Sequence, residues 1–171
     1  MIKFSRLKEK KMKKIAFVFA LALCLGIAVP FADAADQKVV RLGENKSVPG
    51  PDAWFTGKVR IDPLFAADEN VNASGAYVTF EPGARSAWHE HPAGQTLVVV
   101  SGVGRTGTAD GKVWEIKAGD VVRCPANIRH WHGAAPDTGM THMAITGYKD
   151  GENAVWHEKV TDEEYNKPLS K

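Results

Sequence analysis

The stretch that decides the fold lies in the middle of the chain and reads Gly83-Ala-Arg-Ser-Ala-Trp-His89-Glu-His91-Pro-Ala-Gly-Gln95-Thr-Leu-Val-Val-Val-Ser-Gly102. Two histidines stand two residues apart, and a side-chain amide follows four residues after the second. On a strand, residues i and i+2 face the same side, so His89 and His91 can point into one cavity. Imidazole nitrogen and amide oxygen both suit a first-row divalent metal ion. The stretch therefore predicts a metal site on a strand, with Gln95 as a further ligand.

A second pair of histidines follows 39 residues after the first pair. This stretch reads Gly119-Asp-Val-Val-Arg-Cys-Pro125-Ala-Asn127-Ile-Arg-His130-Trp-His132-Gly133. A Gly-Asp turn, a short apolar strand and a Pro-x-Asn turn precede the two histidines. Strand alternation places His132 on the same face as His130, so both are expected to point into the barrel.

Together the two stretches resemble the paired motifs of the cupin superfamily. The first has the form Gly-x5-His-x-His-x3-Gln-x6-Gly, with Gln95 where most cupins carry Glu. The second has the form Gly-x5-Pro-x-Asn-x2-His, with Asn127 where the family usually has Gly. The resemblance implies four metal ligands, which are His89, His91, Gln95 and His130.

Short apolar segments separated by turn residues follow from Lys58 onward, a pattern typical of a sandwich or barrel. The predicted strands cover residues 59–61, 76–80, 95–101, 113–116, 121–122, 140–148 and 154–160. Asp110 and Gly111 form a strong hairpin signal between two of these strands. Thr161, with Glu164 three residues later, is typical of a helix N-terminus. We therefore predict an all-β, single-domain cupin jelly-roll barrel with a short C-terminal helix.

Residues 1–34 have the composition of a secretory signal peptide. A basic segment precedes an apolar run over residues 15–29, and Ala32-Asp-Ala34 follows as a cleavage motif. The apolar run is shorter than the roughly 20 residues that cross a bilayer. We expect export to the periplasm or the exterior, with cleavage near Ala34. The position of the true start, Met1 or Met12, stays open.

The remaining chain is long enough for one domain. We expect residues 35–56 to form an N-terminal arm, residues 57–160 the cupin barrel and residues 161–171 a C-terminal tail. Arg85 is predicted to be a solvated or salt-bridged turn residue. Trp88 and Trp131 alternate away from the histidines, so we expect them in the core.

The charge of the whole chain is +2, with 22 basic and 20 acidic side chains. Residues 1–34 hold seven of the basic and two of the acidic ones, so the remainder has 15 basic and 18 acidic side chains and a charge near −3. No basic patch remains that would indicate nucleic acid. Cys124 is the one cysteine left after processing, which excludes an intrachain disulfide. We expect a small-molecule substrate, no membrane partner after cleavage, and a homodimer or homotetramer.

A closer resemblance extends over residues 57–148. Its main segments are Val59-Arg-Ile-Asp-Pro-Leu-Phe65, Val78-Thr-Phe-Glu-Pro-Gly-Ala-Arg85, His130-Trp-His-Gly-Ala-Ala-Pro136 and Met140-Thr-His142. They are similar to the bacterial manganese-dependent (R)-selective hydroxynitrile lyases. The resemblance implies a divalent metal, manganese first, with iron, nickel or zinc as alternatives, and it implies that His132 and His142 are catalytic. Spacing alone leaves these two histidines open between catalytic bases and groups that orient the ligands.

The substrate pocket depends on the register of the strand over residues 76–80. Either Tyr77 and Thr79 or the alternate set faces the pocket, and we favour the alternate set. With Thr146 added from the strand of His142, the predicted lining residues are Ala76, Val78, Phe80 and Thr146.

The leading hypothesis is an exported, metal-dependent carbon–carbon lyase that converts a cyanohydrin into an aldehyde and HCN. Three alternatives stay open from the sequence. One is an iron-dependent cupin dioxygenase, and another is a metal-dependent decarboxylase or isomerase. The third is a non-catalytic cupin that binds a small molecule or a metal.

Overall fold

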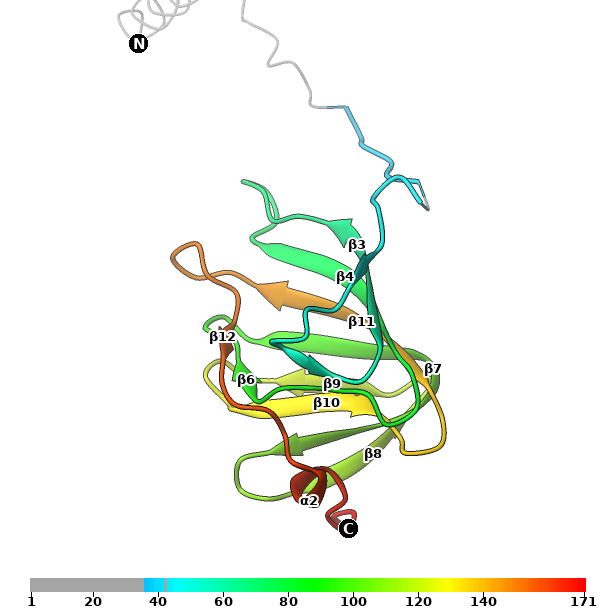
Figure 1. Cartoon of the computed structure of the whole chain (residues 1–171). Coiled ribbons are helices and arrows are strands. Elements are labelled where there is room, and N and C mark those ends of the chain that lie inside the picture. Colours follow the sequence, from blue (N-terminus) through cyan, green and yellow to red (C-terminus); the bar gives the residue numbers. More distant parts are fainter. Residues whose placement is uncertain (1–35, 42) are drawn as a thin grey trace, which may run out of the picture. The chain divides into compact units, whose positions relative to one another are not determined.

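The computed structural model describes residues 36–41 and 43–171 (Figure 1). The chain divides into two units, Met1–Lys38 and Val39–Lys171, and the fold described below is that of the second. The predicted signal peptide, residues 1–34, lies outside the described residues. Within them, no helix combines the length and apolar character needed to cross a membrane.

The described residues form twelve strands and one short helix. In chain order they are β1 (Val48–Pro49), β2 (Phe55–Thr56), β3 (Val59–Phe65), β4 (Ala73–Phe80), β5 (Arg85–Ser86), β6 (His89–Glu90), β7 (Gln95–Thr108), β8 (Val113–Lys117), β9 (Val121–Cys124), β10 (His130–Ala134), β11 (Met140–Gly147), β12 (Val155–Trp156) and α2 (Asp162–Tyr165). This composition and the antiparallel pairing described next confirm the predicted all-β jelly-roll class.

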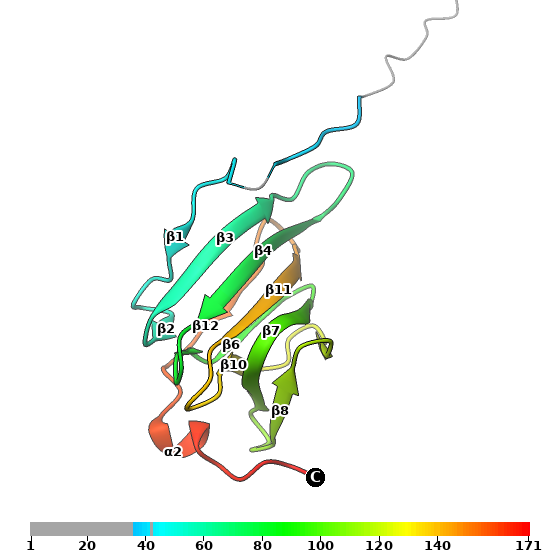
Figure 2. The same ribbon diagram turned by 90° about the vertical axis from the view of Figure 1, so that its right-hand side faces the viewer.

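The strands form one curled sheet in the order β1-β3-β4-β11-β7-β10-β5-β2, with β6, β8, β9 and β12 attached beside this path. Figure 2 shows β3, β4, β11 and β7 side by side. The 14-residue strand β7 joins the two halves of the sheet. Its first half pairs with β9 and β11, and its second half pairs with β8 and β10.

Gly102 lies where β7 passes from one half of the sheet to the other. Its φ angle is +76°, a left-handed value that glycine adopts without strain. A Cβ atom at this position would lie 1.9 Å from the carbonyl oxygen of Gly139. The glycine that closes the first motif is therefore required by both the backbone angle and the close approach of the next strand.

Strand alternation decides which side chains face the inside of the barrel. On β11, buried and half-buried residues alternate along all eight positions, with Met140, His142 and Thr146 among the buried ones. The same period places Val78 and Phe80 of β4 on the buried face. Because the side-chain period of a strand is two, one register places His142 and Thr146 of β11 on the same interior face as Val78 and Phe80 of β4.

An apolar cluster separate from the main core of the barrel lies next to α2. It contains Trp88, Val113, Trp131, Val160 and Tyr165. The predicted core role of the two tryptophans is therefore confirmed. The predicted helix start is also present, because the Thr161 hydroxyl accepts from the Glu164 amide at 3.2 Å and the Glu164 carboxylate accepts from the Thr161 amide at 2.9 Å.

The observed strands differ from the predicted ones in their bounds: β3, β4, β7, β8 and β9 are longer, β11 ends one residue earlier, and the segment 154–160 differs most. The segment 154–160 contains only the two-residue strand β12, because the chain beyond it turns toward α2 after two backbone bonds with Trp88. Strand β3 continues through Pro63, which lacks an N–H, and a register shift follows between Pro63 and Phe65. The predicted arm, residues 35–56, contributes β1 and β2, which pair with β3 and β5 of the same chain.

Arg85 lies in β5 rather than in a turn, and it is only 7% exposed. Its guanidinium donates to the Val160 carbonyl from Nε at 3.2 Å and from Nη2 at 3.1 Å. It also forms a salt bridge of 2.6 Å with Asp162. Of the two roles predicted for Arg85, the structure shows the salt-bridged one.

Candidate metal centre and active site

The histidines of the two sequence motifs meet because β6 and β10 are antiparallel neighbours. His89 and His130 are direct cross-strand partners, and their ring centroids lie 4.4 Å apart. Opposite residues on one face of an antiparallel pair have closely spaced Cβ atoms. His91, which follows β6, brings its ring centroid to 5.0 Å from that of His89 and 5.4 Å from that of His130.

Each of these three rings has its Nδ1 atom next to a backbone carbonyl oxygen. The distances are 3.0 Å from His89 to Ala87, 2.5 Å from His91 to Asn153 and 2.8 Å from His130 to Ile128. A carbonyl oxygen only accepts, so Nδ1 carries the proton and the lone pair lies on Nε2. This is the tautomer in which imidazole binds a metal through Nε2 while a carbonyl fixes the orientation of the ring.

The side chain of Gln95 is also oriented by a hydrogen bond to a neighbouring residue. Its Nε2 atom donates to the hydroxyl of Thr146 at 3.0 Å, and both residues are buried. Its Oε1 atom is buried without a hydrogen-bond partner, as are the Nε2 atoms of His91 and His130. Buried acceptors without partners are uncommon and need an explanation. A divalent cation bound among these atoms would provide one, so the donor set fits the metal that the cupin motifs imply.

His132 lies close to the same centre. Ligand atoms of His89, His130 and His132 all lie within 4.8 Å of one another, a spacing that could hold a metal ion. The ligand set predicted from the sequence has His91 and Gln95 in place of His132. The Nε2 atom of His132 is buried without a hydrogen-bond partner, as are those of His91 and His130, but its Nδ1 atom contacts another histidine rather than a backbone carbonyl. His132 therefore lies beside the four predicted ligands and differs from their three histidines in the group that contacts its Nδ1 atom.

That group is His142 of β11. The Nε2 atom of His142 lies 3.1 Å from Nδ1 of His132, and both rings are buried. Phe80 packs behind the pair, with its ring centroid 5.8 Å from that of His132 and 5.6 Å from that of His142. The backbone amide of His132 donates to the Ser86 hydroxyl at 3.1 Å. The pair is thus held in place by β4, β5, β10 and β11 together.

The five histidines of this cluster, His89, His91, His130, His132 and His142, all have pKa values below the usual range of histidine. Burial lowers the pKa of His130 to about 4 and that of His142 to about 3. Burial, followed by repulsion from neighbouring imidazoles, lowers the pKa values of His89 and His132 well below their usual range. Burial also lowers the pKa of His91. Neutral imidazole is the form that binds a metal, so the cluster is in its binding form at neutral pH.

A cavity of about 240 Å³ opens onto this cluster. Its lining residues are Trp54, Phe55, Ile61, Ser74, Ala76, Val78, His89, His91, Gln95, His132, His142, Ala144, Thr146, Asn153, Ala154 and Trp156. None of them carries a carboxylate, a guanidinium or an ammonium group. The cavity is therefore lined by apolar and neutral polar side chains, and any charge in it would come from the histidines or a bound metal.

The predicted pocket residues fall into two groups. Ala76, Val78 and Thr146 line the cavity, and Thr146 also orients the amide of Gln95. Phe80 does not line the cavity; its buried ring packs against those of His132 and His142, which do. The register of β4 is the one favoured from the sequence.

Several lining residues were not predicted from the sequence. Trp54 and Trp156 come from segments outside the cupin motifs, and the Asn153 carbonyl orients His91. No spacing signal connects these positions to the motifs. The residue types of Trp54, Asn153 and Trp156 do not by themselves indicate that the segments before β2 and around β12 meet at the cavity.

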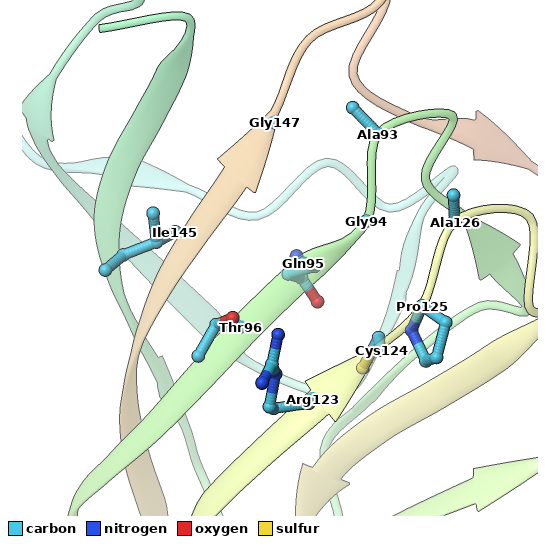
Figure 3. A pocket seen from close by; sticks show the side chains of 10 residues that line it. All are labelled: Ala93, Gly94, Gln95, Thr96, Arg123, Cys124, Pro125, Ala126, Ile145 and Gly147. Atoms are coloured by element: carbon cyan, nitrogen blue, oxygen red, sulfur yellow. The ribbon is translucent and has the colours of Figure 1, made fainter.

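A second cavity, of about 400 Å³, lies where β7 begins and β9 ends (Figure 3). Gln95 and Cys124 are cross-strand partners at this point. Arg123 is the one charged residue in its lining, and no histidine belongs to it. The second cavity therefore lacks the donor set of the first.

Comparisons with known proteins agree with this geometry. The family model of the cupin domain matches residues 76–146. A crystal structure of a cupin-like protein from Thermotoga maritima superposes with a TM-score of 0.67 at 39% identity, over 78% of this chain and 98% of that one. A predicted oxalate decarboxylase from Thermotoga maritima shares the fold, with a TM-score of 0.57 at 23% identity over 63% of this chain and 96% of that one.

The chain belongs to the cupin family. Among curated proteins, it is 53% identical over 131 residues to the (R)-mandelonitrile lyase of Granulicella tundricola. This match covers 77% of the present chain and 100% of that enzyme.

Proposed function

We propose that this cupin is a metal-dependent carbon–carbon lyase of the hydroxynitrile lyase type, which splits a cyanohydrin into an aldehyde and HCN. One observation carries the proposal: a pair of histidines in contact, His132 and His142, lines a cavity without charged side chains, together with three of the four uncharged donors proposed to hold the metal, His89, His91 and Gln95. The 53% identity to an (R)-mandelonitrile lyase supports the same reaction class.

The metal would be held by His89, His91, Gln95 and His130. All four donors are neutral, so a divalent ion bound there keeps its full charge. When bound, such an ion supplies Lewis-acid stabilisation of negative charge on an oxygen or on a leaving anion. We propose manganese, with iron, nickel and zinc as the ions to compare with it.

His132 is the proposed base. In the tautomer in which Nδ1–H of His132 donates a hydrogen bond to Nε2 of His142, the lone pair of His132 lies on Nε2. His132 would take the hydroxyl proton of the cyanohydrin, which leaves the O–H electron pair on the oxygen. That pair forms the carbonyl bond as the C–CN bond breaks, and cyanide leaves with the bonding pair. Return of the proton from His132 to cyanide gives HCN and restores the base.

His142 would orient His132 and, as a lining residue, lie near the departing cyanide. Both histidines line the cavity, and the proposed roles differ because His132 is the one grouped with His89 and His130. The cavity lining holds no ammonium or guanidinium group, so the proposed metal would be the main cationic group available to a substrate.

The test is cyanide release from mandelonitrile by the protein loaded with manganese, with metal-free protein alongside. His132→Ala is the informative variant, and His157→Ala is its matched control because His157 does not line the cavity. We expect release that needs both the metal and His132 and that persists in His157→Ala. Release no faster than in buffer from fully loaded protein would refute the proposal, and oxygen uptake by iron-loaded protein would then be measured.

We also propose that the chain is exported and that the mature protein is a homodimer or homotetramer. The basic and apolar composition of residues 1–34 supports export. N-terminal sequencing of the protein from a periplasmic or culture fraction would test cleavage near Ala34. Light scattering of the purified protein would test its oligomeric state, and a monomeric mass would refute that part.

A further inference from the structure

Two tryptophans outside the cupin motifs form part of the cavity wall. Trp54 precedes the main barrel strands, and Trp156 lies in β12. Their rings are stacked, with centroids 5.0 Å apart and an interplanar angle of 4°. Trp156 also stacks on His89, with centroids 4.7 Å apart and an angle of 27°. The three rings, all of which line the cavity, therefore form a series of stacked contacts from Trp54 to a proposed metal ligand.

The backbone holds this column in place from several sides. Trp156 is the cross-strand partner of His89. The Trp54 carbonyl accepts from the Ala87 amide at 2.7 Å. The Lys159 ammonium donates to the carbonyls of Asp52 and Phe55, which joins the segment before β3 to the segment after β12. The position of Trp54 is thus preorganised rather than left to a free loop.

Trp54 is 40% exposed although one of its faces is covered by Trp156. Single exposed apolar side chains are common on protein surfaces. This one differs because it also lines the cavity, next to Phe55 and Trp156. A ring that enters the cavity can contact these aromatic side chains in the offset or edge-to-face arrangements that aromatic pairs prefer.

We propose that Trp54, supported by Trp156, is a specificity-determining residue that contacts the aromatic substituent of a neutral substrate. For turnover the inference rests on the proposed lyase function, whereas for binding it stands on the cavity alone. The ligand class is a small uncharged molecule with a planar ring, such as an aryl cyanohydrin or an aryl alcohol. The cavity volume of about 240 Å³ and its lack of charged lining residues fit this class.

The experiment compares ligands that differ only in ring planarity. Binding of benzyl alcohol and of cyclohexylmethanol to the metal-loaded protein is measured by calorimetry. Turnover is measured with mandelonitrile and with its cyclohexyl analogue. The variant is Trp54→Leu, and the matched control is Trp114→Leu, because Trp114 is 36% exposed on β8 and does not line the cavity. Trp54→Phe serves as the conservative variant.

We expect the wild-type protein to prefer the planar ligand in both assays. Trp54→Leu should lower the aryl-to-cyclohexyl ratio about two- to tenfold, which is the strength of one aromatic pair. Trp54→Phe should retain most of the preference, and Trp114→Leu should leave it unchanged. Equal melting temperatures and metal contents would show that Trp54→Leu is folded and loaded.

Different failures have different meanings. An unchanged ratio in Trp54→Leu, or wild-type protein that binds both alcohols equally, would overturn the inference while the lyase function could stand. A second result would be no cyanide release by wild-type protein, together with a preference for benzyl alcohol that is lost in Trp54→Leu. It would refute the lyase function and support the contact between Trp54 and the planar ring of a ligand.

Discussion

The Nδ1 atom of His132 lies 3.1 Å from the Nε2 atom of His142, and this contact joins β10 to β11 inside the barrel. Each ring can donate only one proton in its neutral form, so the proposed base role of His132 requires the tautomer in which its Nδ1 donates to His142 and its Nε2 is free. The contact thereby distinguishes His132 from the three histidines whose Nδ1 atoms contact backbone carbonyls. It makes the two motifs of the sequence chemically different although both read His-x-His.

Replacing the two histidines should have unequal effects on turnover. His132→Ala should lower kcat for mandelonitrile by about 100-fold or more, because general-base catalysis contributes about that much. His142→Ala should lower it by roughly 10- to 100-fold through loss of the orienting contact. Steady-state kinetics with metal analysis checks both, and each variant should keep its metal. Loss of metal from His132→Ala would instead place His132 among the ligands.

Thr146→Val should weaken metal binding without removing a ligand. The Thr146 hydroxyl accepts from Gln95 Nε2 at 3.0 Å, and valine leaves that amide free to rotate. We expect about a 10- to 100-fold loss of affinity, measured by competition with a chelator. Thr141→Val is the control, because Thr141 lies on the same strand and bonds to Thr79 away from the site. Equal losses in both variants would contradict the role given to Thr146.

Arg85→Met should destabilise the fold. Methionine fills much of the buried space but leaves the Val160 carbonyl without its donors, which costs about 1–3 kcal/mol. Asp162→Asn should cost less than about 1 kcal/mol, because the Asp162 side chain is 89% exposed. Urea unfolding with equal m-values measures both. A larger loss for Asp162→Asn would show that the ion pair, rather than the buried carbonyl contact, stabilises this corner.

Alkylation of Cys124 should be slow at neutral pH and should accelerate strongly in base. Burial disfavours the thiolate and raises the pKa of Cys124 from 9.0 to about 11. Only the thiolate reacts, so the rate should rise about tenfold per pH unit between pH 8 and pH 10. Labelling with iodoacetamide, followed by mass spectrometry, checks the slope. Cys124→Ser corrects for reaction at Cys24, and a rate at pH 8 equal to that of glutathione would contradict the prediction.

Strand alternation explains why much of the fold and site could be predicted from the sequence. A period of two places Ala76 and Val78 on the cavity side of β4 and aligns His130 with His132 on β10. The positive φ of Asn127, +60°, also explains how asparagine replaces the glycine of the cupin motif. The ligand and catalytic assignments remain predictions until metal and substrate are measured.

Features that depend on contacts between distant segments could not be predicted in the same way. Trp54 and Trp156 stack on each other although about a hundred residues separate them, and neither belongs to a periodic pattern. Phe80 lies on the same face of β4 as Val78, but its ring packs against those of His132 and His142 and does not line the cavity. Arg85 reads as a surface charge, and only the meeting of β5 with the chain before α2 buries it.

The unbroken course of β7 has a consequence for how the protein opens. Its first half pairs with β11, which carries His142, and its second half pairs with β10, which carries His130 and His132. Separating either neighbour exposes amides of the same strand, so the strands that carry His132 and His142 share one cooperative unit. We therefore expect the amides of Leu97 and Thr106 to exchange with solvent deuterium at similar, slow rates. A partly opened form that keeps β10 in place but releases His142 from His132 would not accumulate.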